Sequence, residues 1–251
     1  MTPPPIVSER LRWLGHATVV LEIGGATLLT DPVLRNRIAH LRRHAEPAVP
    51  PPGLDAVLIS HMHHDHLDLP SLRALDPSAR LIVPRGAGRA VRKLGREVEE
   101  LSVGDEITVG AARVLAVEAA HDGRRGPWGS AAETLGYVVE GGARVYFAGD
   151  TEVFPGMADL GRIDCALLPI WGWGFTLGPG HMDPDEAAEA TALVAPAVAV
   201  PIHWGTFLPV TARARHKPLL VLPPQRYAER AAELAPETEV RILPPGGELA
   251  L

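Results

Sequence analysis

The sequence predicts a layered α/β fold, with helices lying outside two packed β-sheets. Short apolar stretches of strand length recur along the chain, helix-like stretches lie among them, and the glycine pairs Gly24-Gly25 and Gly141-Gly142 stand where hairpin turns are expected. Strands in runs with interspersed helices bury their apolar faces best when sheet packs on sheet. With 251 residues, 46% of them apolar, the chain can build such a core as a single domain over residues 1–251.

The first part of the chain reads as strands bounded by turn residues. The pair Gly24-Gly25 joins two of these strands, and Asp31-Pro32 ends the run. Residues 34–53 then form a long loop rich in Pro, Arg and His, and a loop of that length in a compact domain is usually functional or mobile. The strands expected here are 10–14, 18–23, 26–30 and 55–60.

After residue 60, helices alternate with strands. The clearest helix spans 184–194, because Asp183 suits the N-cap, Pro184 the first helical position and Glu186 the third position after the cap. The other helices expected are 69–75, 86–94 and 225–234. The strands expected are 81–83, pieces of 98–120, 134–139, 144–148, 164–169, 197–202 and 239–243.

Composition and charge exclude several classes of protein. The net charge of −6 and pI near 6.0 argue against binding to nucleic-acid backbones or anionic membrane surfaces. The single cysteine, Cys165, rules out an internal disulfide and a cysteine-based zinc cluster, and its apolar neighbours predict a buried position. Neither a secretory signal nor a membrane span is visible, so a cytoplasmic location is expected. Lysine occurs only as Lys93 and Lys217, a bias typical of GC-rich bacterial genomes.

Three imidazoles and a carboxylate fall within six positions directly after the strand 55–60. The run His61-Met62-His63-His64-Asp65-His66 has the spacing H-x-H-x-D-H, and imidazole nitrogen and carboxylate oxygen are the ligands that borderline metals prefer. Further candidates end other apolar strands, at His121, Asp150 and His203. Because α/β proteins place ligand-binding groups at the carboxyl ends of strands, the sequence predicts one binuclear metal site built from distant segments.

These motifs resemble those of metallo-β-lactamase-fold hydrolases. The branch that they resemble most contains N-acyl-phosphatidylethanolamine phospholipase D-like and L-ascorbate-6-phosphate lactonase-like proteins. The resemblance implies an αββα sandwich of two mixed β-sheets flanked by helices, with the site at one edge. Besides H-x-H-x-D-H, the matching text is W-L-G-H-A-T at 13–18, T-D-P at 30–32, F-A-G-D-T at 147–151, H-M-D-P-D-E-A at 181–187 and I-H-W-G-T at 202–206.

The resemblance also implies a distribution of ligands between two metal ions. The first metal would be held by His61, His63 and His121, the second by Asp65, His66 and His203, with Asp150 bridging both. Such a nitrogen and oxygen set leaves positions open for water, and two metals about 3.5–4 Å apart would share a hydroxide that attacks carbonyl or phosphorus. Zinc is the expected metal, and manganese or iron also suits these ligands.

Several further residues receive expected roles. Asp65 is expected to ligate metal and accept a proton from the attacking water, and His181 to contact the substrate or protonate the leaving group. His16 and Asp31 are expected behind the ligands, where a carboxylate orients an imidazole, or else in structural hydrogen bonds. The candidates for the substrate pocket are Trp128, Trp171, Trp173, Phe175, Arg42, Arg43, Arg124 and Arg125.

The expected function is hydrolysis of a phosphodiester, lactone or related ester of an anionic small molecule. Classical β-lactam hydrolysis is disfavoured because no signal peptide is visible. A non-hydrolytic di-iron redox protein of the same fold shares the ligand set, although no flavin or rubredoxin-like segment follows. A metal-dependent nuclease is the third alternative, which the acidic balance of the chain disfavours.

Overall fold

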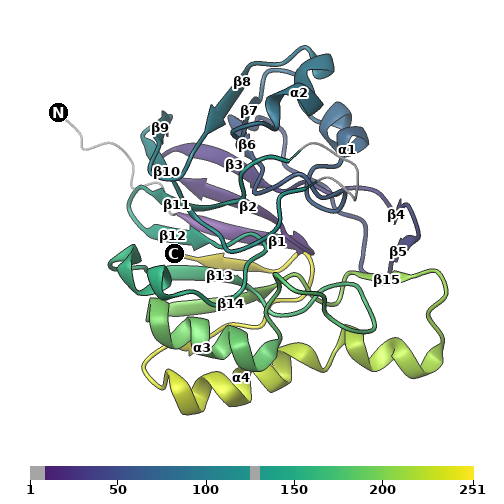
Figure 1. Cartoon of the computed structure of the whole chain (residues 1–251). Helices are drawn as coiled ribbons and strands as arrows, with labels where there is room; N and C mark the ends of the chain where they lie inside the picture. The colour runs from purple at the N-terminus through teal and green to yellow at the C-terminus, as the bar shows by residue number, and fades with distance from the viewer. Residues whose placement is uncertain (1–8, 125–130) are drawn as a thin grey trace.

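The structure, a computed structural model, describes residues 9–124 and 131–251 and arranges them in four layers (Figure 1). Two seven-stranded sheets pack face to face in the middle. Figure 1 shows α1 and α2 outside one sheet and α3 and α4 outside the other, so the expected αββα sandwich is confirmed. The bounds of these helices are α1 Leu69–Ala74, α2 Gly88–Val91, α3 Pro184–Val194 and α4 Pro223–Leu234.

Both large sheets are mixed. The first has the order β17-β1-β2-β3-β6-β7-β8, antiparallel up to β3 and parallel from β3 onward. Its strands are β1 Arg10–Gly15, β2 Thr18–Ile23, β3 Ala26–Thr30, β6 Ala56–Leu58, β7 Arg80–Pro84, β8 Val98–Leu101 and β17 Glu248–Ala250.

The second sheet has the order β16-β14-β13-β12-β11-β10-β9, with parallel pairing among β12, β13, β14 and β16. Its strands are β9 Glu106–Val109, β10 Ala112–Glu118, β11 Leu135–Glu140, β12 Arg144–Phe147, β13 Cys165–Pro169, β14 Val198–Ile202 and β16 Glu239–Val240. A small third sheet, β15-β5-β4, is made of β4 Arg37–Ile38, β5 Leu41–Arg43 and β15 Phe207–Pro209.

Alternation along the first sheet explains the layering. In β2, Val19 and Leu21 face the main core between the sheets, whereas Val20 faces the smaller core beneath α1 and α2. In β6, Leu58 and Val57 divide in the same way. Successive side chains of a strand point to opposite faces, so a strand covered on both sides must be apolar throughout.

Several element boundaries differ from the sequence prediction. The expected loop 34–53 contains the hairpin β4–β5, which β15 extends into a sheet. The expected helix 86–94 is a short α-helix followed by a 3-10 turn, Arg92–Leu94, which ends at Gly95 with a φ of 66°. The expected strand 239–243 stops at Val240, where its pairing with β14 ends. Two 3-10 segments, Pro155–Leu160 and Ala214–Leu220, complete the described elements.

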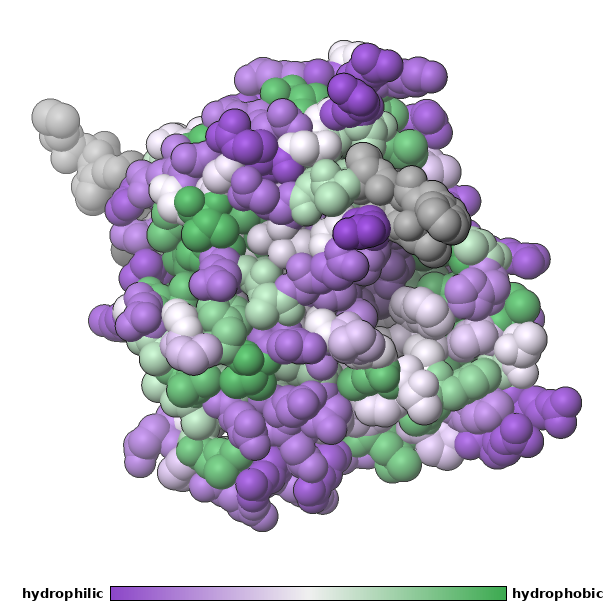
Figure 2. Space-filling view, in the orientation of Figure 1, coloured by the Kyte–Doolittle hydropathy of each residue, from purple (hydrophilic) through white to green (hydrophobic). Residues whose placement is uncertain are grey.

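The described helices and one face of the surface can be compared with what a membrane-spanning segment requires. None of the described helices has the length and apolar character that a bilayer crossing requires. On the face drawn in Figure 2, apolar side chains occur in small groups among hydrophilic ones. Cys165 is buried within β13, as its apolar neighbours predict, and burial raises the pKa of its thiol to about 12.

Two buried tyrosines in neighbouring strands differ in one hydrogen bond, which makes a matched stability test. Tyr137 donates its hydroxyl to the Ile59 carbonyl of the other sheet at 2.7 Å, whereas the hydroxyl of Tyr146 has no hydrogen-bond partner among the described residues. We expect Tyr137→Phe to lower the free energy of unfolding by about 1–2 kcal/mol, because the buried carbonyl loses its donor. Tyr146→Phe should leave that free energy unchanged or raise it. Urea unfolding measures the free energy of unfolding of both variants, provided that their m-values equal that of the wild type. Equal losses of stability in the two variants would contradict this account.

Candidate metal centre

The metal-binding candidates of the sequence meet at one edge of the sandwich. Because β12, β13 and β14 run parallel and β10 points the same way, the carboxyl ends of these strands share that edge. His121 follows β10, Asp150 follows β12 and His203 follows β14, while the loop after β6 contributes His61 and its neighbours from the other sheet. The side chains thus come from both sheets.

The backbone at this edge is locally strained. Three of the non-glycine residues with positive φ are His16 (54°), Asp31 (34°) and His203 (63°). Such a conformation costs an L-residue about 1–3 kcal/mol and persists only where its surroundings enforce it. Hydrogen bonds donated by backbone N–H groups hold two of these residues in place. His203 N donates to the His16 carbonyl at 2.9 Å, and His16 N donates to the side-chain Oγ1 of Thr206 at 2.7 Å.

The first ligand group consists of His61, His63 and His121. One nitrogen of each ring lies within 4.8 Å of the others, and His121 Nε2 is 3.1 Å from His63 Nδ1. Burial lowers the pKa of all three imidazoles, which favours the neutral form that binds metal. The Nε2 atom of His61 is buried and has no hydrogen-bond partner among the described residues. A nitrogen that binds a metal ion would have this environment.

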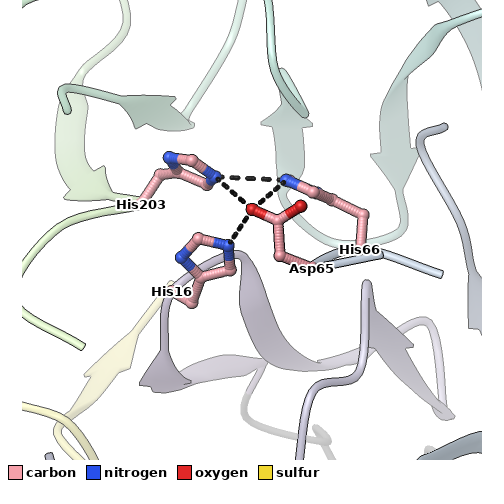
Figure 3. A group of neighbouring side chains, drawn as sticks. All are labelled: His16, Asp65, His66 and His203. Carbon is pink, nitrogen blue, oxygen red and sulfur yellow. Dashed lines mark hydrogen bonds and ion pairs between the residues drawn. The ribbon is translucent and has the colours of Figure 1, made fainter. Parts of the chain in front are cut away.

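The second group consists of His16, Asp65, His66 and His203, whose side chains point toward one another in Figure 3. His66 Nε2 lies 3.1 Å from His203 Nε2, and Asp65 Oδ2 lies 3.9 and 4.0 Å from these two nitrogens. Burial lowers the pKa of His203 to about 3. Two imidazole nitrogens and a carboxylate oxygen thus converge on one point, which suits a divalent cation.

Asp150 lies between the two groups. Its carboxylate oxygens are 3.1 Å from His66 Nε2, 3.2 Å from His203 Nε2 and 3.9 Å from His61 Nε2. Burial by itself raises the pKa of this carboxyl, but the His203 and His66 imidazoles outweigh burial and hold the pKa well below its usual range. The Asp150 carboxylate therefore lies within 3.9 Å of imidazole nitrogens from both groups.

Four of the five candidate ligand imidazoles are oriented by a partner on the outer side of the ring. His66 Nδ1 lies 2.7 Å from Asp31 Oδ2, and His61 Nδ1 lies 2.9 Å from the hydroxyl of Ser60. Two further rings meet backbone carbonyls, His121 Nδ1 that of Gly180 at 2.6 Å and His203 Nδ1 that of Trp171 at 2.7 Å. Such partners select the tautomer that turns the opposite nitrogen toward a metal, so the residues present fit a metal centre.

Three of these outer partners were not predicted in that role from the sequence. Ser60 directly precedes His61 and also donates its hydroxyl to Asp31 at 2.5 Å, so one carboxylate organises both groups. The carbonyls of Gly180 and Trp171 are the other two. The polar residue next to the H-x-H-x-D-H run was the available signal for Ser60, whereas the contact of Gly180 with His121 depends on the tertiary fold.

A cavity of about 560 Å³ opens onto both groups. One wall contains His63, Asp65 and Asp150, and the facing wall is the turn of the β4–β5 hairpin. His181 lines the cavity with Nε2 3.3 Å from Asp150 Oδ2. The other lining residues are Ile38, Ala39, His40, Leu41, His64, Asp122, Arg124 and Trp173.

The predicted pocket residues divide accordingly. Trp173 and Arg124 line the cavity, whereas Arg125 and Trp128 lie outside the described residues. Contrary to expectation, Arg42, Arg43, Trp171 and Phe175 are not among its lining residues.

The physical reason differs for each of these four. Arg43 is buried against Phe207, where it donates to the Val33 carbonyl, and burial lowers its pKa to about 10. The exposed Arg42 lies between Arg37 and Leu208 in the small sheet. Trp171 packs against the main core, and Phe175 stacks on His216 at 3.9 Å between ring centroids.

Known proteins share this fold and these motifs. A family model described as a beta-lactamase superfamily domain matches residues 26–204, so the chain belongs to the metallo-β-lactamase-fold superfamily. Within it, the chain belongs among the metal-dependent hydrolases. It is 34% identical over 257 residues to a UPF0173 metal-dependent hydrolase of Aeropyrum pernix, covering 94% of this chain and 95% of that one.

Two further comparisons extend this placement. An N-acyl-phosphatidylethanolamine-hydrolyzing phospholipase D of Caenorhabditis elegans is 30% identical over 234 residues, covering 78% of this chain and 63% of that one. The solved structure of Igni18, a metallo hydrolase of Ignicoccus hospitalis, has a TM-score of 0.71 at 22% identity, covering 98% and 99% of the two chains. The latter is a likeness of fold.

A substitution at Gly180 tests the outer partners without replacing a candidate ligand residue. Gly180 has a φ of +81°, and a Cβ there would lie 2.6 Å from Nδ1 of His121, whereas a Cβ at Gly178 would meet nothing within 4 Å. We expect Gly180→Ala to weaken metal binding by about 10–100-fold, because the ligand ring must move. Gly178→Ala is the matched control. Competition titrations with a chromophoric chelator measure both, and equal affinities in the two variants would refute the assigned contact.

Proposed function

We propose that this protein is a hydrolase with two metal ions, most simply zinc, that cleaves a phosphodiester, lactone or related ester. The observation that carries the proposal is the position of Asp150 between two ligand groups that open into one cavity. A structural metal site is closed by four protein ligands, whereas the seven proposed ligands here would be shared between two metal ions, which leaves room for water and substrate. These seven are His61, His63, His121, Asp65, His66, His203 and Asp150.

Two residues that line the cavity are suited to different proton transfers, Asp65 as the acceptor and His181 as the donor. When bound, the two metal ions would activate water and polarise a carbonyl or phosphoryl group. Asp65 would accept the proton of the attacking water, since its carboxylate lines the cavity. The neighbouring His16 and His66 imidazoles outweigh the burial of Asp65 and hold its pKa well below the usual range, which keeps it ionised.

His181 is suited to protonate the leaving group. Its Nε2 lies 3.3 Å from Asp150 Oδ2, the oxygen that also meets His66, and the side chain lines the same cavity. Burial lowers its pKa, but Asp150 outweighs burial and raises the pKa above its ordinary value, so the imidazole keeps a proton to donate.

The cavity walls support a substrate with an apolar and an anionic part. Ile38, Leu41 and Trp173 provide an apolar wall, and Arg124 contributes a cation beside it. The C. elegans relative is named for hydrolysis of N-acyl-phosphatidylethanolamine, a phosphodiester, which supports a phosphodiester over other esters. The apolar wall is compatible with a lactone as well.

Metal content tests the binuclear part of the proposal. We expect about two equivalents of metal per chain in the wild type and fewer in Asp150→Asn, because this carboxylate contacts both groups. Asp76→Asn is the control, since Asp76 lies on the surface and its carboxylate accepts hydrogen bonds from Ser78, away from the metal centre. Elemental analysis of purified protein gives the stoichiometry. A coloured, iron-containing protein that leaves esters intact would instead favour the redox alternative.

Activity on a substrate panel tests the assigned proton acceptor. Bis-p-nitrophenyl phosphate, simple lactones and a β-lactam should be compared with wild-type protein, Asp65→Ala and the surface control Asp76→Ala. Loss of the proton acceptor should lower kcat by about 100-fold or more for whichever ester is cleaved. Unchanged turnover in Asp65→Ala would overturn the mechanism.

A further inference from the structure

The loop between β13 and α3 makes several polar contacts with the metal centre, and one of them is an indole N–H bonded to a candidate ligand carboxylate. The indole Nε1 of Trp173 donates a hydrogen bond to Asp65 Oδ2 at 2.9 Å. The same oxygen lies 3.1 Å from His16 Nε2. Two ring nitrogens from distant segments therefore meet one oxygen of the carboxylate, which has little freedom left to rotate.

The position of the Trp173 ring depends on the β4–β5 hairpin. Trp173 packs against a small separate core of four buried residues, and the His40 ring meets it edge-on, 5.1 Å between centroids. The four core residues are Val33, Ile38, Leu41 and Phe207. Two come from the hairpin, so the segment that walls the cavity also sets the direction of the indole N–H.

The four described indoles make different contacts. Trp13 Nε1 donates to the backbone carbonyl of His16 at 2.8 Å, and Trp204 Nε1 donates to the Pro201 carbonyl at 2.9 Å. Trp171 Nε1 is buried without a hydrogen-bond partner among the described residues. Of these four, only the indole of Trp173 donates to the side chain of a candidate ligand, although its ring is only partly buried. A partly buried polar contact with a ligand side chain is better explained by orientation of that ligand than by core packing.

We infer that Trp173 is a positioning residue that orients Asp65 for the second ligand group and links that group to the substrate-facing hairpin. The inference rests on the proposed two-metal function. A rigid carboxylate presents its oxygen to His66 and His203 at a set distance, and loss of one of its two donors lets it turn away. The first group, which has no contact with Trp173 among the described interactions, keeps its geometry.

The test compares two conservative aromatic variants. Trp173→Phe removes the indole N–H and keeps an aromatic ring. The control Tyr146→Phe removes a buried hydroxyl that has no hydrogen-bond partner among the described residues. Stepwise zinc titration against a competing chelator measures the affinity of each metal. We expect Trp173→Phe to weaken one step by about 10–100-fold and leave the other unchanged, with both steps unchanged in Tyr146→Phe.

The weakened step must belong to the second group. His121→Ala, which removes a ligand of the first group only, assigns the steps. Loss in both steps, loss in the wrong step or no loss in Trp173→Phe would overturn the inference. Loss of one step in a variant whose urea unfolding matches the wild type excludes a general effect of misfolding.

A separate variant tests whether the β4–β5 hairpin helps to position Trp173. His40→Ala removes the ring that meets Trp173 edge-on and should weaken the same step by a smaller factor. If binding of the second metal is unchanged in His40→Ala but weakened in Trp173→Phe, the hairpin does not position Trp173. Trp173 would then still orient Asp65. Failure of the wild type to bind a second zinc would refute the proposed two-metal function itself, a result distinct from either outcome.

Discussion

The buried carboxylate of Asp150 is the interaction on which this edge of the molecule depends. An anion withdrawn from water is stable only where positive charge or hydrogen-bond donors surround it. Here the imidazoles of His66, His203 and His181 approach within 3.1–3.3 Å, each from a different segment. The convergence of strand ends, the strained turns and the oriented rings can all be understood as ways of bringing those groups to one carboxylate.

The outer contacts extend the same logic away from the centre. Asp31 contacts His66 and also accepts from Ser60, whose hydroxyl meets His61, so a single carboxylate orients one ring in each ligand group. Its own backbone has a positive φ, as do those of His16 and His203. Strain is concentrated where side chains must be aimed, while most residues of the strands that precede them are buried.

The candidate ligand residues could be predicted from the sequence for a physical reason. Metal binding needs particular side chains, and the runs around His61, Asp150 and His203 follow apolar strands whose ends must share an edge. The arginines show the limit. Arg43 looked like a substrate contact because its charge suggests exposure, yet the ring of Phe207 and the carbonyl of Val33 bury it. The role of the β4–β5 hairpin was also hidden, because its third strand, β15, comes from more than 150 residues further along the chain.

The division of the ligand groups between two sheets has a consequence beyond chemistry. The loop after β6 belongs to one sheet, whereas His121, Asp150 and His203 extend from the other. Metal ions held between them would cross-link the two sheets at this edge of the sandwich, and such cross-links would be absent from the unfolded chain. Resistance to proteases, and with it the lifetime of the protein in a cell, would then follow the supply of metal.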